Sequence, residues 1–214
     1  MLRAIAVAFL PMVVGGAAEA PRHATLEEAI ARGDLADVKA HVATEPARAT
    51  RAGKGGLPLH QAILRNKTEI AFFLLENGAE VDAADRTRRT PLHLAVERGN
   101  VALVIALLER RAKPNEHDAV GWTPLHHAAA RDKVAVARAL LAGGADAKTL
   151  SEQGGTALHE AAASGGAEMA QLLLDAGVDA GIVSKTGVTA LEVAREFKNE
   201  AVVAVLTGTK NKAR

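Results

Sequence analysis

Apolar residues recur at intervals of three and four over most of this chain. Leu103, Leu107 and Leu108 fall on one helical face in this way, and the segment 169–173 follows the same spacing. This periodicity predicts short amphipathic helices that each bury one side. Polar segments such as 82–89 lie between them and predict turns that project from the helices.

A six-residue pattern returns at a constant interval along the chain. It reads LPLHQA at 57–62, TPLHLA at 90–95, TPLHHA at 123–128, TALHEA at 156–161 and TALEVA at 189–194. One further step back brings Leu26 and Ala29 into register, so that five steps without insertion or deletion relate six copies. The 33-residue period and the T-P-L-H-x-A pattern resemble the ankyrin repeat family. The resemblance covers Ala24 to about Gly208 and implies an all-α solenoid of stacked helix pairs with projecting turns.

Individual residues suit their expected positions in the repeat. Thr90 can cap the start of a helix, and Pro91 suits the first helical position. Gly144 fits a left-handed residue at the end of a second helix, and Gly121 fits a turn. Arg111 stands in the register of Gly144, where the left-handed conformation costs a residue with a side chain roughly 1–2 kcal/mol. We therefore expect strain at that junction.

A stack of this kind needs specialised ends. No helix pair can cover its own apolar face, so each copy must pack on the next and the outer copies must be polar outside. Glu27 and Glu192 replace the motif histidine in the first and last copies. The predicted organisation is a signal peptide at 1–20, an N-terminal capping repeat at 21–56, four repeats at 57–89, 90–122, 123–155 and 156–188, and a C-terminal capping repeat with a tail at 189–214.

The N-terminal segment 1–20 has the pattern of a signal peptide. Arg3 gives a positive start, residues 4–14 are apolar, and residues 15–20 are rich in small side chains. Cleavage after Ala18 or after Ala20 fits this pattern. A membrane anchor is the alternative, but a span needs about 20 apolar residues and Glu19 closes the stretch earlier. We expect an exported protein, periplasmic or secreted, from a bacterium, with no stable membrane span after cleavage.

Composition excludes several kinds of function. The formal net charge is +1, which argues against the general basicity that non-specific nucleic-acid binding requires. The chain has no cysteine, and therefore no disulfide, thiolate metal site or cysteine nucleophile. Aromatic residues make up 2% of the chain, too few for base stacking. The core must be built from small aliphatic side chains.

The recurrent motif histidines do not predict a metal site or an enzyme. These are His60, His93, His126 and His159. Equivalent residues of stacked helix pairs lie about 8–10 Å apart, whereas two zinc ligands each lie about 2 Å from the ion. The resemblance implies that each imidazole binds backbone in its own turn region. No phosphate-binding loop and no catalytic arrangement of Ser, His and Asp is present, so we expect neither a cofactor nor catalysis.

The resemblance also implies where a partner binds. Ankyrin repeat proteins bind partners through the turn tips and the exposed side of the first helices, which together line a concave groove. In this sequence the candidate residues are Arg65, Arg86, Arg89, Arg98, Trp122 and Arg131. Arg32, Arg65, Arg98 and Arg131 stand at one position of successive repeats and form a ladder. The ladder either meets an acidic partner or is a solvated face favoured by the helix dipole. Trp122 is either a binding anchor or packs across its turn.

The predicted function is that of a monomeric scaffold that binds a protein partner through this concave face. Two alternatives share the fold: a secreted effector that acts on host proteins, and a chaperone or protector of an exported enzyme. The motif residues build the scaffold, so they do not identify the partner.

Overall fold

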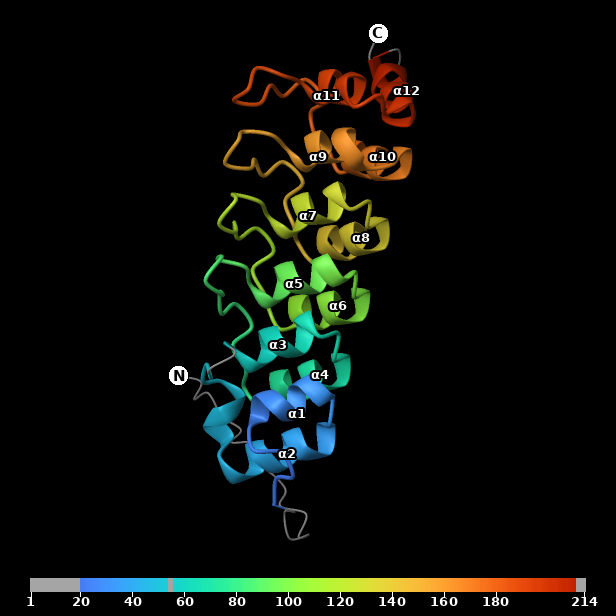
Figure 1. The fold of residues 1–214 in the computed structure, drawn as a ribbon. Helices are drawn as coiled ribbons and strands as arrows, with labels where there is room; N and C mark the ends of the chain where they lie inside the picture. Colours follow the sequence, from blue (N-terminus) through green and yellow to red (C-terminus); the bar gives the residue numbers. More distant parts are fainter. Residues whose placement is uncertain (1–19, 54–55, 211–214) are drawn as a thin grey trace, which may run out of the picture.

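The computed structural model describes residues 20–53 and 56–210, which form an all-α stack of helix pairs without a β-strand (Figure 1). The pairs are α1 (Leu26–Arg32) with α2 (Leu35–Thr44), α3 (Pro58–Leu64) with α4 (Thr68–Glu76), α5 (Pro91–Arg98) with α6 (Val101–Glu109), α7 (Pro124–Ala130) with α8 (Val134–Ala142), α9 (Ala157–Ser164) with α10 (Ala167–Asp175), and α11 (Ala190–Glu196) with α12 (Glu200–Lys210). A 3-10 turn, η1 (Pro46–Ala49), follows α2. The predicted all-α solenoid is confirmed.

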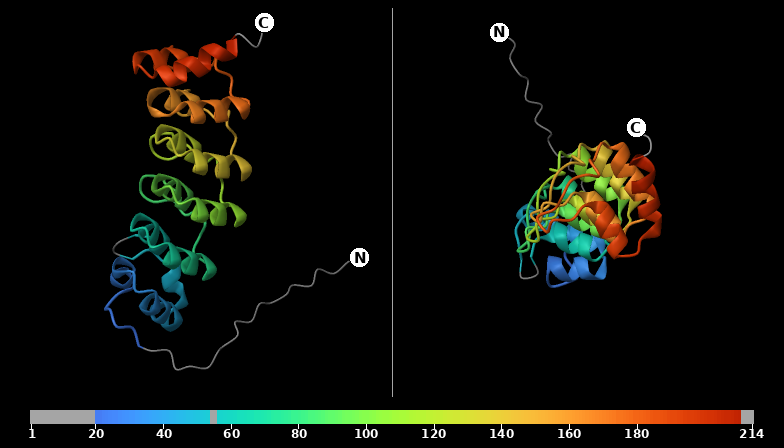
Figure 2. Two further views of the ribbon diagram at one scale, coloured as in Figure 1. Left: turned by 90° about the vertical axis from the view of Figure 1, so that its right-hand side faces the viewer. Right: turned by 90° about the horizontal axis from the view of Figure 1, so that it is seen from above.

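The elements form three parallel rows along the stack. The first helices make the middle row, the second helices lie beside them, and the connecting hairpins project on the other side (Figures 1 and 2). Seen from above, the hairpins gather on one side of the molecule. No helix among the described residues is long and apolar enough to cross a membrane. The predicted signal peptide lies almost wholly in residues 1–19, outside the described part of the chain.

The core follows the register of the sequence repeat. Leu92, Leu125 and Leu158 stand at one position of successive first helices and are at most 2% exposed. Ala95 and Ala128, at another position, are fully buried. Small side chains at this position let neighbouring first helices approach closely, and the leucines then fill the space between repeats. The apolar periodicity of the sequence therefore corresponds to one continuous core.

The motif histidines link the start of each first helix to the end of the hairpin that follows in the chain. His93 Nδ1 accepts a hydrogen bond from the Thr90 N–H at 3.2 Å, so the ring proton is on Nε2. That Nε2–H donates to the carbonyl of Trp122, in the following hairpin, at 3.2 Å. His126 and His159 repeat both contacts. This confirms the backbone role of the histidines, and burial lowers the pKa of His126 to about 4.

Arg111 has the left-handed backbone that the register predicts, with φ 64°. Gly78, Gly144 and Gly177 occupy the same position in other repeats with φ between 85° and 91°. Arg88 is a second left-handed arginine, which the sequence analysis did not predict. It stands at the hairpin position that Gly121 occupies in the next repeat and has φ 59°. Both arginines hold a conformation that L-residues adopt at a cost.

Replacing Arg111 with glycine is expected to raise the free energy of unfolding by about 1 kcal/mol, because glycine removes the left-handed penalty. Gly144→Ala is the matched control. A Cβ at Gly144 would meet no atom within 4 Å, so backbone strain alone should lower stability there, by about 1 kcal/mol. Urea denaturation measures both changes. Destabilisation by Arg111→Gly would contradict the assigned strain.

Candidate protein-binding surface

The hairpins and the first helices together form one continuous surface, which we call the hairpin face. It consists of the exposed side chains of residues 82–89, 115–122, 148–155 and 181–188 and of helices α3, α5, α7, α9 and α11. Backbone hydrogen bonds join successive hairpins: Ala119 N–H donates to Thr87 O at 2.9 Å, Glu152 N–H to Gly121 O at 3.1 Å, and Lys185 N–H to Gln153 O at 2.8 Å. These bonds fix the spacing of the hairpins before any partner binds.

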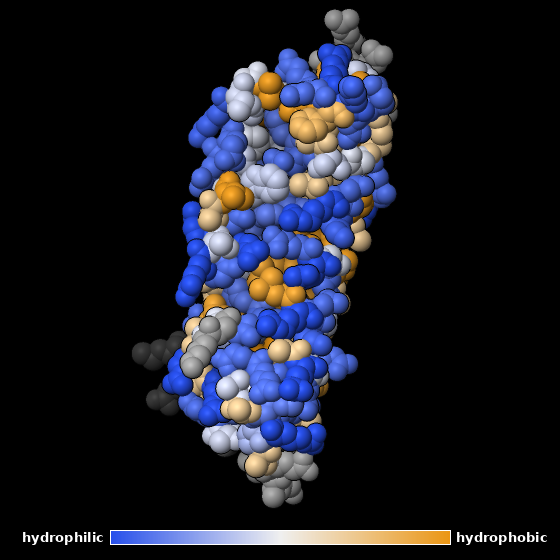
Figure 3. Space-filling view, in the orientation of Figure 1, coloured by the Kyte–Doolittle hydropathy of each residue, from blue (hydrophilic) through white to orange (hydrophobic). Residues whose placement is uncertain are grey.

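The hairpin face is hollowed near its N-terminal end. A pocket of 610 Å³ lies between the hairpin of residues 84–87 and the segment around Gly53 and Gly56. Leu57, Leu64 and Arg86 are among its lining residues. The side of the molecule in Figure 3 is mostly hydrophilic, and apolar side chains form separate spots on it. The surface therefore favours polar and charged recognition over burial of one long apolar stripe.

Two aspartates shape the hairpins that carry Arg89 and Trp122. Asp118 Oδ1 accepts the backbone N–H groups of Val120 and Trp122, both at 3.0 Å. Asp85 makes the equivalent bonds to Thr87 and Arg89. Burial alone would raise the pKa of Asp118, but hydrogen bonds from Trp122 and His127 outweigh it, and the pKa lies below its ordinary value.

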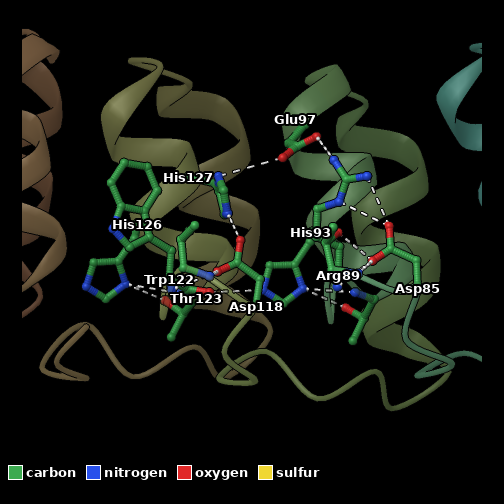
Figure 4. Close-up of polar contacts among 12 residues, drawn as sticks. Asp85, Arg89, His93, Glu97, Asp118, Trp122, Thr123, His126 and His127 are labelled. Atoms are coloured by element: carbon green, nitrogen blue, oxygen red, sulfur yellow. Dashed lines mark hydrogen bonds and ion pairs between the residues drawn. The ribbon is translucent and has the colours of Figure 1, made fainter. Parts of the chain in front are cut away.

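A polar network runs from one hairpin to the next across the first helices (Figure 4). The Arg89 guanidinium contacts Asp85 at 3.0 Å and Glu97 at 3.3 Å. Glu97, at the end of α5, also lies 3.8 Å from Arg131 Nη2, and the other terminal nitrogen of Arg131 contacts His127 Nδ1 on α7. His127 Nε2 lies 2.7 Å from Asp118 Oδ2. The network therefore links two hairpins through the helices α5 and α7.

The hydrogen bonds of His127 follow from its neighbours. Arg131 Nη1 lies 2.9 Å from His127 Nδ1, and a guanidinium can only donate. Nδ1 therefore accepts, and the ring proton is on Nε2, where it is donated to Asp118. The indole of Trp122 packs against the same ring at 5.1 Å between centroids. Both ring nitrogens are engaged, so His127 links neighbouring repeats.

The structure separates the six predicted site residues into two groups. Arg89, Trp122 and Arg131 lie in or against the network, where they contact Glu97 or His127. The side chains of Arg65, Arg86 and Arg98 are exposed and have no hydrogen-bond or ion-pair partner within the described part of the chain. Of the ladder, Arg32 pairs with Glu28 at 3.0 Å. The free positive charge of the ladder is thus concentrated on α3 and α5.

Sequence reasoning missed the acidic half of the network. Asp85 and Asp118 stand at one position of successive repeats, shortly before Arg89 and Trp122, and that recurrence was a usable signal. His127 was not among the predicted site residues, yet it is 5% exposed and lies at the centre of the network. Its link to Glu97 passes through Arg131 and joins side chains on neighbouring helices, which no local motif reveals.

The residues of the hairpin face do not form a metal centre. Among residues 20–53 and 56–210, no cluster of three or more His, Asp or Glu side chains could hold a metal ion. The imidazoles of the motif instead bind backbone groups, and His127 binds a carboxylate and a guanidinium.

Comparison with known proteins agrees with this architecture. The family model for ankyrin repeats (3 copies) matches residues 26–118, 59–151 and 125–214, which together span most of the chain. A search of curated proteins found no match. Ankyrin repeats generally mediate protein–protein interaction, and proteins built from them are typically non-enzymatic scaffolds. With its regular sequence period, its paired helices and these matches, the chain belongs to the ankyrin repeat family.

Proposed function

We propose that the protein is a non-enzymatic scaffold that binds one protein partner through the hairpin face, as a monomer. The observation that carries this proposal is the combination of a rigidly linked row of hairpins with exposed side chains that no internal contact uses. Arg65, Arg86 and Arg98 are available in this way, and Trp122, which packs against His127, is half-buried. A preformed surface of this kind binds without the cost of ordering loops.

The partner is proposed to present an acidic surface to the N-terminal half of the hairpin face. Arg86 lines the 610 Å³ pocket, and Arg65 and Arg98 stand at or next to the ends of the helices α3 and α5. Exposed ion pairs contribute about 0–1 kcal/mol each. The arginines therefore contribute mainly to association rate and to the choice of partner.

Reversing Arg65 and Arg98 together to glutamate is expected to slow partner association severalfold and to weaken its salt dependence, because both charges face solvent and steer the encounter. The thermal midpoint should change little, since neither side chain has an internal partner within the described residues. Arg131 is left out because its reversal would place a second carboxylate beside Glu97 and remove the contact to His127.

The measurement is surface plasmon resonance with the partner that affinity capture recovers. Trp122→Ala should act mostly on dissociation, as expected of a packed anchor. The double variant Arg110→Glu with Arg138→Glu makes the same charge change at the end of α6 and on α8, in the row of second helices. Equal effects of the two double variants on association would place the interface elsewhere.

The protein is further proposed to be exported, periplasmic or secreted, by a bacterium. We expect cleavage after Ala18 or after Ala20, from the Arg3 start, the apolar run at 4–14 and the small side chains that follow. Intact-mass measurement of the protein recovered outside the cytoplasm checks this. A full-length chain in the membrane fraction would instead support an anchor.

A further inference from the structure

The polar network of the hairpin face stops at the repeat that follows α7 and α8. Glu160 on α9 stands in the register of His127, and Ser151 stands in that of Asp118. Gly155 takes the position that Trp122 and Arg89 fill in the two preceding repeats. Ser164 likewise replaces Arg131, so this repeat lacks the guanidinium that contacts His127.

Two polar side chains of this repeat lack hydrogen-bond partners among the described residues. Within the described part of the chain, the Glu160 carboxylate has no hydrogen-bond or ion-pair partner, although the residue is half-buried. Burial raises the pKa of Glu160 to about 7. Ser151 is 6% exposed and its hydroxyl has no hydrogen-bond partner among the described residues. A carboxyl group held out of water without a counter-charge is costly to ionise.

The comparison between repeats shows what is missing. His127, in the register of Glu160, is contacted by the Arg131 guanidinium at 2.9 Å. Ser164 stands at the equivalent position four residues after Glu160 and donates its hydroxyl to Ala130 O at 2.8 Å, so it supplies no cation to the Glu160 carboxylate. A metal ion is an unsuitable substitute, since no cluster of three or more metal-binding groups lies among residues 20–53 and 56–210.

We propose that the Glu160 carboxylate receives an arginine side chain of the partner protein, which takes the place that Arg131 fills beside His127 one repeat earlier. The inference rests on the proposed function, because it assumes that the partner lies on the hairpin face. Arginine is favoured over lysine because its planar guanidinium binds a carboxylate through two parallel hydrogen bonds. The partner surface is then acidic toward α3 and α5 and basic toward α9.

The first test needs no partner. The side-chain carboxyl carbons are titrated by NMR in the full chain, with and without N-acetylarginine amide at about 100 mM. We expect the arginine probe to lower the pKa of Glu160 by about half a unit, because a cation stabilises the ionised form. N-acetylcitrulline amide, which has the same shape without the charge, should not lower it.

Glu80 is the internal control, since it is exposed and also has no partner within the described residues. General electrostatic association of the probe would shift Glu80 and Glu160 alike. Equal shifts at the two positions, or no shift at Glu160, would overturn the proposal.

The second test uses the captured partner. Glu160→Gln keeps the shape of the side chain and should weaken binding roughly tenfold, whereas Glu80→Gln should not. Binding to the unaltered protein at pH 7 should release about half a proton, because Glu160 is then half ionised when free and fully ionised in the complex. Calorimetry in buffers of different ionisation enthalpy measures this release, which Glu160→Gln should abolish.

The outcomes distinguish this inference from the proposed function. If reversal of Arg65 and Arg98 slows association but Glu160→Gln leaves affinity and proton release unchanged, the partner lies on the hairpin face and the arginine contact is wrong. If neither set of variants changes binding, the hairpin face itself is the wrong surface.

Discussion

Replacing Leu125 with alanine is expected to lower the free energy of unfolding by about 2–5 kcal/mol. Leu125 lies on α7 near the middle of the stack and is 2% exposed, so truncation leaves a cavity between repeats as well as lost burial. The loss acts on two repeat interfaces at once, because each first helix packs on the one before and the one after. Urea denaturation at constant pH measures the change.

Ile105→Ala is the matched control for Leu125→Ala. Ile105 is an aliphatic residue on the neighbouring helix α6, but it is 44% exposed. Its truncation is expected to change stability by less than about 1 kcal/mol. A cost for Leu125 as small as that for Ile105 would contradict the assigned register of the core.

Lowering the pH from 7 to 5 is expected to destabilise the fold, with His126 alone contributing about 2 kcal/mol. His126 is 1% exposed, and burial lowers its pKa to about 4. In the unfolded chain its pKa returns to about 6.5. Between these values the unfolded state binds more protons, so stability is full above pH 6.5 and is lost as the pH falls toward 4.

His60, His93 and His159 act in the same direction, because burial lowers the pKa of each. Glu160 acts in the opposite direction: its raised pKa of about 7 favours the folded state at low pH and disfavours it as the pH rises through 7. Denaturation of Glu160→Gln at pH 7 and pH 5 therefore isolates the histidine contribution. An NMR titration that finds His126 protonated in the folded protein at pH 5 would contradict its buried, neutral role.

The fold could be predicted from the sequence because its determinants are periodic and local. The helix starts at Pro91 and Pro124 and the left-handed residues Gly144 and Arg111 that follow α8 and α6 could each be assigned from the register of the repeat. Packing between repeats then follows, because any repeat must cover the next.

The candidate site could be predicted only in part. The exposure of Arg65 and Arg98 could be predicted from their position in the repeat. The ion pairs of Arg89 with Asp85 and Glu97 could not. Such ion pairs depend on which side chains of neighbouring repeats reach each other, and those positions vary from copy to copy. His127 and Glu160 stand at one position of the repeat, but His127 is hydrogen-bonded to Asp118 whereas Glu160 is affected by burial alone.

Affinity capture with matched surface variants tests the central claim most directly. Three full-length baits are compared by quantitative mass spectrometry: the unaltered protein, the double reversal of Arg65 and Arg98 to glutamate, and the double reversal of Arg110 and Arg138 to glutamate. We predict that one protein is recovered stoichiometrically with the first and third baits and is strongly depleted with the second. A protein that is retained by the hairpin-face variant and lost from the variant in the row of second helices would contradict binding through the hairpin face.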